Sequence, residues 1–411
     1  MNLLPLCILS LMTGTSGDGI DAVLVEFSGT VERLRWKVQG RFRQAYSLAL
    51  AERLRLASNR ASSNVVLITE LHAEIGQAYA QLAGEACDAY RVDLVALSGQ
   101  TIFHIPRVDD RVGCRIKSTL QIGEGAWVLE RCGVPVICDF RQSDLAAGGE
   151  GAPLVAFGDL LLYHEPGRAR AIHNIGGISN LTYLPADGDS RFVRAFDTGP
   201  GNCLIDEAAQ RFFGVLFDRD GELAARGTVN ETALSALLRH PYLQLSPPKS
   251  TGREVFSLGF MLRHTPLVEC SALDLLATLT AFTAESIAAA YRAHVVPFGL
   301  DEVLVAGGGA LNRTLIDVLR TKLPVPVSTF EEQGMLSRDR EALAFAVMAY
   351  FAAHGLTNTL PQVTGARHAV VAGKLLFPPL GRSQSRLRAF LRHGQSTDCR
   401  PFSGQDLGER S

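Results

Sequence analysis

The 411-residue sequence lacks several features that mark common classes of protein. None of its 8 cysteines belongs to a Cys-x-x-Cys pair, which argues against a zinc site and for reduced, buried thiols in a cytoplasmic protein. No run reaches the roughly 18 apolar residues of a membrane span. The formal net charge is only -2, so we expect neither nucleic acid nor an anionic membrane as a partner.

Two familiar nucleotide-binding motifs are also missing. No Gly-Lys-Ser/Thr ends a P-loop, and the run Gly307-Gly308-Gly309 does not match Gly-x-Gly-x-x-Gly. Hydrophobic residues make up 47% of the chain and charged residues 20%, which is an ordinary globular composition. The length is enough for two domains or one large domain.

A pattern of strand, glycine turn, strand, turn and strand covers residues 6–38 and returns at residues 171–196 with little residue identity. Residues 1–12 carry no Lys or Arg and run into a glycine turn, so we interpret them as the first buried strand and not as a signal peptide. The echo predicts two similarly built α/β domains facing a central cleft.

The rest of the chain alternates helical patterns with short buried strands. We expect the first domain at 1–138, joined by a return of the chain at 355–379, and the second domain at 139–354. The main helices are predicted at 44–57, 64–85, 203–213, 274–295, 312–319 and 340–353. After residue 379 Gly, Ser, Gln and Arg dominate, which predicts a disordered tail at 380–411.

The turn between residues 13 and 21 has the composition of a phosphate-binding loop. Gly14, Gly17 and Gly19 let backbone N–H groups converge on phosphate oxygens, and the hydroxyls of the loop add donors. Its two aspartates, Asp18 and Asp21, are unfavourable beside phosphate unless Mg²⁺ or a sugar hydroxyl intervenes. The alternative is a plain hairpin turn, for which seven consecutive turn residues would be long.

The segment around Asp197 pairs a carboxylate with a glycine-rich turn. An apolar run leads to Asp197, residues 198–201 are expected to form a turn, and Asn202 can cap the following helix. A carboxylate in that place could act as a base beside a bound anion. The alternative is that Asp197 only caps the turn.

Other candidates are weaker when taken singly. Residues 174–180 repeat the glycine turn but lack a positive charge, so backbone amides and metal would hold a phosphate there, and His173 before them fits a packed core residue. Lys249–Arg253 form a cationic, hydroxyl-rich loop, and Arg141 follows a predicted strand end. Each of these cations could serve an anionic ligand or a surface salt bridge.

In this order, the turns resemble the anhydro-N-acetylmuramic acid kinases over about residues 8–379. The resemblance is carried by Gly14-Thr15-Ser16-Gly17-Asp18-Gly19-Ile20-Asp21, Gly99-Gln100-Thr101, Gln121-Ile122-Gly123, Asp139-Phe140-Arg141, Gly148-Gly149-Glu150-Gly151-Ala152-Pro153, Asn174-Ile175-Gly176-Gly177-Ile178-Ser179-Asn180, Asp197-Thr198-Gly199-Pro200-Gly201-Asn202, Pro248-Lys249-Ser250-Thr251-Gly252-Arg253-Glu254, Gly307-Gly308-Gly309, Glu341-Ala342 with Ala344-Phe345, and Thr364-Gly365-Ala366.

The resemblance implies an actin-like (ribonuclease H-like) α/β fold, a cytoplasmic homodimer and a role in recycling cell-wall fragments. It implies hydrolysis of the 1,6-anhydro bond of 1,6-anhydro-N-acetylmuramic acid coupled to phosphorylation at O6, with ATP as donor and N-acetylmuramate 6-phosphate as product. Mg²⁺ is the implied companion of ATP, and its ligands stay open.

The resemblance also implies residue roles. Asp197 corresponds to the general base that activates a water molecule. Sugar contacts fall to Gln100, Arg141 and Glu341. The implied ATP contacts are Gly14, Thr15, Ser16, Gly17, Asp18, Gly19, Ile20, Asp21, Asn174, Gly176, Gly177, Gly307, Gly308 and Gly309.

The chain departs from the family pattern at two places inside this region. Ser98 stands where the family usually has His, and Ala156-Phe157-Gly158 stands where it tends to have Pro and then His. Either change could alter sugar specificity. A kinase of another small sugar, or a non-catalytic ATP- or sugar-binding regulator, therefore stays an alternative.

Overall fold

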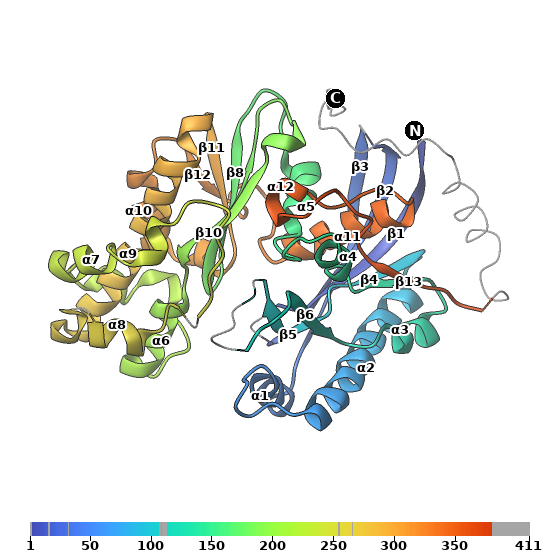
Figure 1. Ribbon diagram of the computed structural model, residues 1–411, viewed down its shortest axis with the longest axis horizontal. Coiled ribbons are helices and arrows are strands. Elements are labelled where there is room, and N and C mark those ends of the chain that lie inside the picture. Colours follow the sequence, from blue (N-terminus) through green and yellow to red (C-terminus); the bar gives the residue numbers. More distant parts are fainter. Residues whose placement is uncertain are drawn as a thin grey trace. The chain divides into compact units, whose positions relative to one another are not determined.

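The computed structural model describes residues 2–379 except for 15, 16, 32, 107, 109–112, 254 and 265. The predicted tail at 380–411 therefore lies outside the described residues. The chain forms two compact units, one made of the residues up to Leu162 together with those from Asp339 onward, the other of Tyr163–Arg338 (Figure 1).

The first unit is built on a six-stranded mixed sheet. β1 pairs antiparallel with β2 and parallel with β4, and β4 pairs parallel with β7. The two edge strands are antiparallel to their neighbours: β3 pairs with β2, and β13 pairs with β7. In spatial order the strands are β13 (Lys374–Leu376), β7 (Val136–Cys138), β4 (Leu94–Leu97), β1 (Asn2–Met12), β2 (Gly19–Thr30) and β3 (Leu34–Ala45). β13 brings the end of the described chain back to this sheet.

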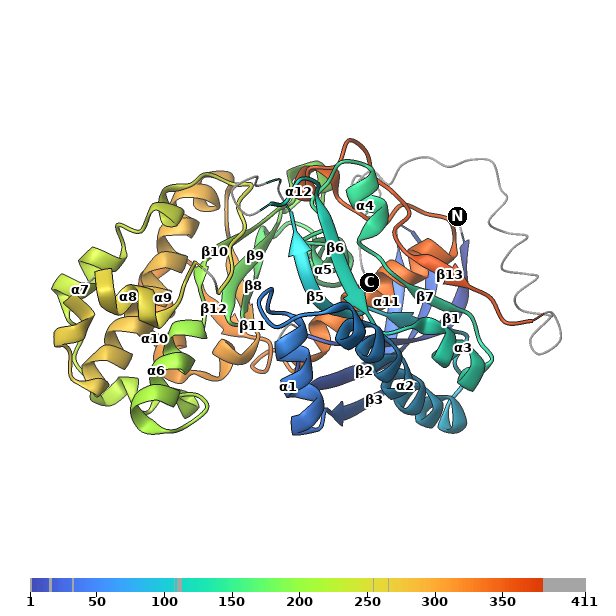
Figure 2. The ribbon, with the colours of Figure 1, turned by 60° about the horizontal axis from the view of Figure 1, so that its bottom comes forward.

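Helices cover both faces of this sheet because its central strands, such as β2 and β4, are buried on both sides. One face packs on α1 (Leu48–Ala57), α2 (Val65–Ala89) and α3 (Gly125–Cys132), and Figure 2 shows α3 beside the long α2. The other face packs on α11 (Asp339–Ala353), where the rings of Phe27 and Tyr350 stack at 4.9 Å.

The second unit repeats this design with five strands. Their order is β10 (Arg194–Pro200), β9 (Ile178–Leu184), β8 (Arg170–Ile175), β11 (Glu302–Ala306) and β12 (Val327–Thr329). The first three are antiparallel, and β8, β11 and β12 are parallel. The strand directions match those of β3, β2, β1, β4 and β7, so the predicted architectural repeat and the actin-like, ribonuclease H-like α/β class are confirmed.

The helices of the second unit are α6 (Cys203–Phe213), α7 (Glu231–Leu237), α8 (Leu258–His264), α9 (Ala272–His294) and α10 (Arg313–Lys322). α9 packs on the sheet and on the smaller helices. By length and composition the span Ala272–Phe298 could cross a membrane, but 72% of its most apolar window is buried inside the protein, as in a core helix.

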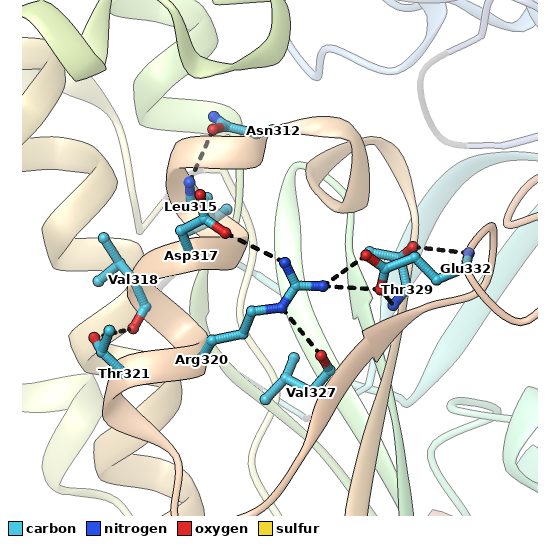
Figure 3. A network of polar contacts seen from close by, with 9 residues as sticks. All are labelled: Asn312, Leu315, Asp317, Val318, Arg320, Thr321, Val327, Thr329 and Glu332. Atoms are coloured by element: carbon cyan, nitrogen blue, oxygen red, sulfur yellow. Dashed lines mark hydrogen bonds and ion pairs between the residues drawn. The ribbon is translucent and has the colours of Figure 1, made fainter.

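A polar network fixes the last part of the second sheet (Figure 3). Arg320 on α10 donates to the carbonyl of Val327 at 3.2 Å and to both carboxylate oxygens of Glu332 at 2.7 and 2.9 Å. Asn312 caps the same helix by accepting the N–H of Leu315 at 3.0 Å. The contacts of Arg320 hold α10 against β12, and the cap at Asn312 fixes the start of α10 a few residues after the Gly307–Gly309 segment.

Several elements were not predicted from the sequence. They are the hairpin β5 (Gln100–Ile105) and β6 (Ser118–Ile122), the helices α4 (Gln142–Ala146), α5 (Val155–Tyr163), α7, α8 and α12 (Pro361–Thr364), the short strands β12 and β13, and 3-10 turns at Ser190–Phe192, Arg219–Gly221, Ala224–Arg226, Pro241–Gln244, Pro266–Glu269, Val296–Phe298 and Gly308–Leu311. Most are short, so they carry too little periodicity to be recognised.

The first boundary between the units follows Leu162, later than the predicted 138/139 boundary. The second precedes Asp339, earlier than the predicted 354/355 boundary. The reason is that α5 and α11 belong to the first unit. A Cβ on Gly158 of α5 would lie 2.5 Å from Ala344 of α11, so the two helices cross closely. Gly158 is one of the residues by which the chain departs from the family pattern that it resembles, and here it serves helix packing.

A buried ion pair fastens this helix crossing. Arg340 donates to the two carboxylate oxygens of Asp159 at 2.9 and 2.5 Å, and the two side chains are 1% and 0% exposed. Burying two charges is costly, and removing one partner leaves the other uncompensated.

Arg340→Leu should therefore destabilise the first unit by about 3–5 kcal/mol. Both tryptophans, Trp36 and Trp127, lie in that unit, so urea unfolding followed by tryptophan fluorescence reports on it alone. The matched control is Arg55→Leu, whose ion pair with Glu52 is exposed and should contribute less than about 1 kcal/mol. Equal effects of the two variants would contradict the expectation.

Candidate active site

Asp197 lies inside β10 and not at a turn as the sequence suggested. The strand continues to Pro200, and its pairing with β9 is irregular between Asp197 and Gly199. A bulge of this kind re-aims a side chain. Asp197 is half-buried, so its carboxylate is not sealed in the core of its unit.

A second segment holds Asp197 in place. The N–H of Thr251 donates to Oδ2 of Asp197 at 2.8 Å, and the N–H of Asp197 donates to the carbonyl of Lys249 at 3.1 Å. The hydroxyl of Tyr242 donates to the carbonyl of Asp197 at 2.8 Å. The side chain and both backbone groups of Asp197 are thus hydrogen-bonded to residues 242–251.

The three glycine segments of the second unit meet at the end of β8. A Cβ on Gly201 would lie 2.2 Å from the carbonyl oxygen of Gly176, and one on Gly309 would lie 2.3 Å from the side chain of Ile175. Gly307 has φ +86°, and a Cβ there would lie 2.7 Å from Oδ1 of Asn174. The glycines at these positions permit backbone contacts that no other residue allows.

The start of α6 is bound to the glycine turn, and Asn202 does not cap the helix as the sequence suggested. The N–H groups of Gly201 and Cys203 donate to the carbonyl of Gly177 at 3.0 and 3.1 Å, and that of Asn202 donates to the carbonyl of Gly176 at 2.8 Å. The Asn202 side chain makes no cap hydrogen bond and donates to the carbonyl of Ile175 at 3.4 Å.

A cation lies beside this turn, although the local sequence has none. Exposed Arg253 reaches over Gly177, so a Cβ on that glycine would lie 2.9 Å from Nη2 of Arg253. Arg253 also acts on Asp206 in the first turn of α6. Burial raises the pKa of Asp206 to about 6, and Arg253 opposes that rise.

His173 is a buried core residue, as the sequence suggested. It is 1% exposed, with Nδ1 at 3.1 Å from the Tyr291 hydroxyl and Nε2 at 2.7 Å from the Ser179 hydroxyl. Ser179 lies 2.7 Å from the hydroxyl of Thr198, the residue after Asp197. These buried hydrogen bonds link Tyr291, His173 and Ser179 to Thr198 and so support the strand irregularity at Asp197 from within the core.

In the first unit the predicted phosphate loop is tied to the start of the hairpin. The carbonyl of Gly14 accepts the side-chain N–H of Gln100 at 3.0 Å and the N–H of Gly17 at 3.2 Å. Ser98, where the resembled family pattern has His, accepts the N–H of Thr13 at 3.1 Å and is part of this support. Thr15 and Ser16 lie outside the described residues.

The second half of that loop is strand. Ile20 is fully buried in the core with α1 and α2, so its side chain does not face a ligand. Asp21 pairs with Arg43 across the strands at 3.4 Å, and Asp18 is exposed. A Cβ on Gly19 would lie 2.5 Å from the carbonyl of Gln44, which makes this glycine a packing requirement.

Two predicted sugar contacts, Arg141 and Glu341, share one environment. Arg141 donates to the carbonyl of Gly151 at 2.8 Å. Burial lowers the pKa of Arg141, while the charges of Glu341 and Asp144 raise it. Asp144 in turn accepts the N–H of Gly151 at 2.8 Å. The structure therefore brings Arg141, Glu341 and the glycine-rich segment 148–151 together.

Several buried polar atoms near this cluster have no hydrogen-bond partner among the described residues. They include Oε1 of Gln100, Oε1 of Gln121 and Nε of Arg141. Gln121 and Gln100 belong to the two strands of the hairpin, and Gln142, next to Arg141, donates to the carbonyl of Thr119 on β6 at 3.0 Å. Unsatisfied buried groups are costly, so they fit a ligand that offers both donors and an acceptor.

In the part of the chain that the structure describes, no group of three or more His, Cys, Asp or Glu side chains could hold a metal ion. The sequence left the metal ligands open, and the described residues supply no dedicated set.

The chain matches the sequence model of the anhydro-N-acetylmuramic acid kinases over residues 6–378. The anhydro-N-acetylmuramic acid kinase of Caldanaerobacter subterraneus subsp. tengcongensis is 39% identical over 385 residues, which cover 90% of this chain and 96% of that one. For the Bacillus thuringiensis subsp. konkukian enzyme the identity is 39%, with 91% and 100% covered. The chain belongs to the anhydro-N-acetylmuramic acid kinase family. It is therefore a kinase, a phosphotransferase with an alcohol group as acceptor.

Solved structures of more distant proteins also align with this family member. The activator of the 2-hydroxyisocaproyl-CoA dehydratase from Clostridium difficile is 13% identical with a TM-score of 0.42, covering 85% of this chain and 94% of that one. A ROK family glucokinase from Streptomyces griseus is 13% identical with a TM-score of 0.37, covering 83% and 98%. The fold class rests on the strand order of each unit and not on these likenesses.

The sequence missed three features of the candidate site. Tyr242 lies in a 3-10 turn with no recognisable pattern, and Asp206 looks like an ordinary first-turn carboxylate. The motifs at 99–101 and 121–123 were identified in the sequence, but their place on the paired strands of a β5–β6 hairpin was not predicted. The signal available in the sequence was the glutamine on each strand of the hairpin, Gln100 on β5 and Gln121 on β6.

Asp206→Asn should flatten the pH dependence of stability in mildly acidic solution. Between its ordinary pKa of 3.8 and the folded value of about 6, the folded protein retains a proton that the unfolded chain releases. The stability contributed by Asp206 is thus full below pH 4 and is lost as the pH rises to 6. Melting temperatures across pH 4–7 should fall less for the variant than for wild type, whereas exposed Asp317→Asn should follow wild type.

Gly201→Ala should destabilise the second unit by about 1–3 kcal/mol, because the new methyl group meets a carbonyl that cannot move without breaking the turn. Gly308→Ala is the matched control, since the nearest atom to a Cβ there lies at 3.6 Å. Thermal unfolding followed by circular dichroism measures both. A stable Gly201→Ala variant would show that the turn is not constrained by this contact.

Proposed function

We propose that the chain hydrolyses the 1,6-anhydro bond of 1,6-anhydro-N-acetylmuramic acid and phosphorylates O6 with ATP, giving N-acetylmuramate 6-phosphate and ADP. Membership of the kinase family supports the substrate and the reaction type. The observation that carries the mechanism is the half-buried carboxylate of Asp197, held at a strand irregularity by the N–H of Thr251.

Asp197 is proposed as the general base. An aspartate with a pKa near its usual value of about 4 is ionised at neutral pH, so it needs position more than a shifted pKa. It takes one proton from a water molecule, whose oxygen attacks the anomeric carbon. The bond between that carbon and O6 breaks, and O6 accepts the γ-phosphoryl group as ADP leaves.

The glycine segments are proposed to bind ATP. In the first unit the residues are Gly14–Asp21, with the contribution of Ile20 limited to its backbone; in the second they are Asn174, Gly176, Gly177 and Gly307–Gly309. Phosphoryl transfer needs alignment and charge neutralisation more than covalent help from the protein. Gly176 suits this role because a Cβ there would have 3.7 Å of clearance, which leaves its backbone approachable.

Mg²⁺ would accompany the ATP phosphates. This ion keeps several water ligands and binds through substrate phosphates with only one or two carboxylates. Exposed Asp18 in the phosphate loop is a candidate carboxylate ligand. A bound Mg²⁺ would relieve the repulsion between the aspartates of that loop and a phosphate.

The sugar is proposed to contact Gln100, Arg141 and Glu341. The buried atoms Oε1 of Gln100 and Nε of Arg141, which lack partners among the described residues, supply an acceptor and a cationic donor. A sugar with hydroxyl groups and a lactyl carboxylate offers the complementary groups.

We further propose that the protein is a cytoplasmic homodimer, that it recycles cell-wall fragments, and that it has no nucleic-acid or membrane partner. The near-neutral formal charge of -2 agrees with a small-molecule enzyme.

Sugar-dependent release of ADP, with mass analysis of the product, tests the reaction. A 6-phosphate product from anhydro-N-acetylmuramic acid is the expected result. Release of ADP only with another acceptor would assign a different sugar kinase, and binding without turnover would assign a regulator.

Asp197→Asn should bind ATP and the sugar, melt near the wild-type temperature and lose turnover by about a hundredfold or more, because the amide cannot accept the proton. Asp317→Asn, an exposed change in the same unit, should keep full activity. Near-normal turnover by Asp197→Asn would remove the base assignment.

A further inference from the structure

Asp197 and Lys249 form a closed set of contacts with Tyr242. Lys249 accepts the N–H of Asp197 through its backbone carbonyl, and Tyr242 donates its hydroxyl to the backbone carbonyl of Asp197 at 2.8 Å. The ammonium group of Lys249 lies 5.0 Å from the centre of the Tyr242 ring. Two residues far from Asp197 in sequence are thus both fixed to it.

The side chain of Lys249 is unusually enclosed for a lysine, with 5% exposure. Burial lowers its pKa, and the charge of Asp197 raises it. A cation is buried only where an opposite charge or an aromatic face offsets the loss of water. The carboxylate of Asp197 and the ring of Tyr242 provide both.

We propose that Lys249 is a positioning residue for the reaction: its ammonium group holds the Asp197 carboxylate in the orientation in which Oδ2 accepts the N–H of Thr251. This inference rests on the proposed function, because it gives Asp197 the role of base. It adds a residue that acts on the base and not on the sugar or ATP.

Other charges around Lys249 belong to different elements. Arg194, at the start of β10, lies with its guanidinium 3.6 Å from the centre of the Phe298 ring. His294, at the end of α9, has its pKa lowered by burial and then by Lys249 and Arg194, so it is neutral at pH 7. Lys249 interacts electrostatically with Asp197, and Lys249 and Arg194 both act on His294.

The expected effect of Lys249→Met follows from the loss of this neighbouring charge. The pKa of the base should rise, which moves the acidic limb of the pH profile of kcat/KM upward by about one pH unit. Turnover at pH 7 should fall about tenfold, because the carboxylate also loses its fixed orientation. The KM for ATP should stay within about twofold of wild type, since Lys249 contacts the proposed base and not the proposed ATP segments.

Lys249→Arg is the rescue variant, because it keeps the charge and should restore the wild-type acidic limb. Lys322→Met is the matched control in the same unit, where the lysine pairs with Glu285 on the surface at 2.6 Å. It should have the wild-type profile. Lys249→Gln repeats the test with a polar side chain if the methionine variant does not fold.

The profiles are measured with the coupled ADP assay on the full chain, beside Asp197→Asn. If Asp197→Asn loses turnover while folded Lys249→Met or Lys249→Gln keeps the wild-type acidic limb, Lys249 has no such role and the proposed function stands. If Asp197→Asn is active, the base assignment fails and this inference fails with it. A displaced limb in Lys249→Arg would likewise overturn it, even where the uncharged variants do not fold.

Discussion

The close approach of backbone to backbone at the end of β8 is the constraint on which the second unit depends. The carbonyls of Gly176 and Gly177 receive three N–H groups from the start of α6, and Gly201 and Gly309 leave no room for a side chain. Because these contacts use main-chain groups, their geometry is set by the fold and varies little with side-chain rotamers. The bulge at Asp197 lies on β10, which β9 separates from β8 in the same sheet, so the proposed base is carried on the same rigid frame.

Asp197 and the β5–β6 hairpin differ in how their own polar groups are hydrogen-bonded. The N–H of Thr251 binds the carboxylate of Asp197, while the Tyr242 hydroxyl and the Lys249 carbonyl bind the backbone C=O and N–H of the same residue. Around the β5–β6 hairpin, Gln100, Gln121 and Arg141 keep buried atoms without a partner among the described residues. The first arrangement suits a group that must be held in one orientation for proton transfer, and the second suits a surface completed by a ligand.

The departures from the family pattern have local structural roles. Ser98 holds the first residue of the phosphate loop through the N–H of Thr13, and its hydroxyl is as able as an imidazole to accept that bond. Gly158 lets α5 cross α11 at a distance that a Cβ would prevent. Neither position removes a residue of the proposed chemistry, and the changes are absorbed by packing and by the support of the loop.

The sequence by itself determined the repeated strand pattern, the long helices and the family, because apolar periodicity and ordered glycine motifs are local signals. It also selected Asp197, Gly176, Gly177 and Arg141. Only the tertiary structure decided that Asp197 lies at a strand irregularity and that the first N–H groups of α6 bind the carbonyls of Gly176 and Gly177. It also decided that Lys249 and Tyr242 lie beside Asp197 and that Arg253 lies beside Gly177. These are contacts between residues distant in the chain, so their energies depend on how the sheet brings the segments together and leave no periodic trace in the sequence.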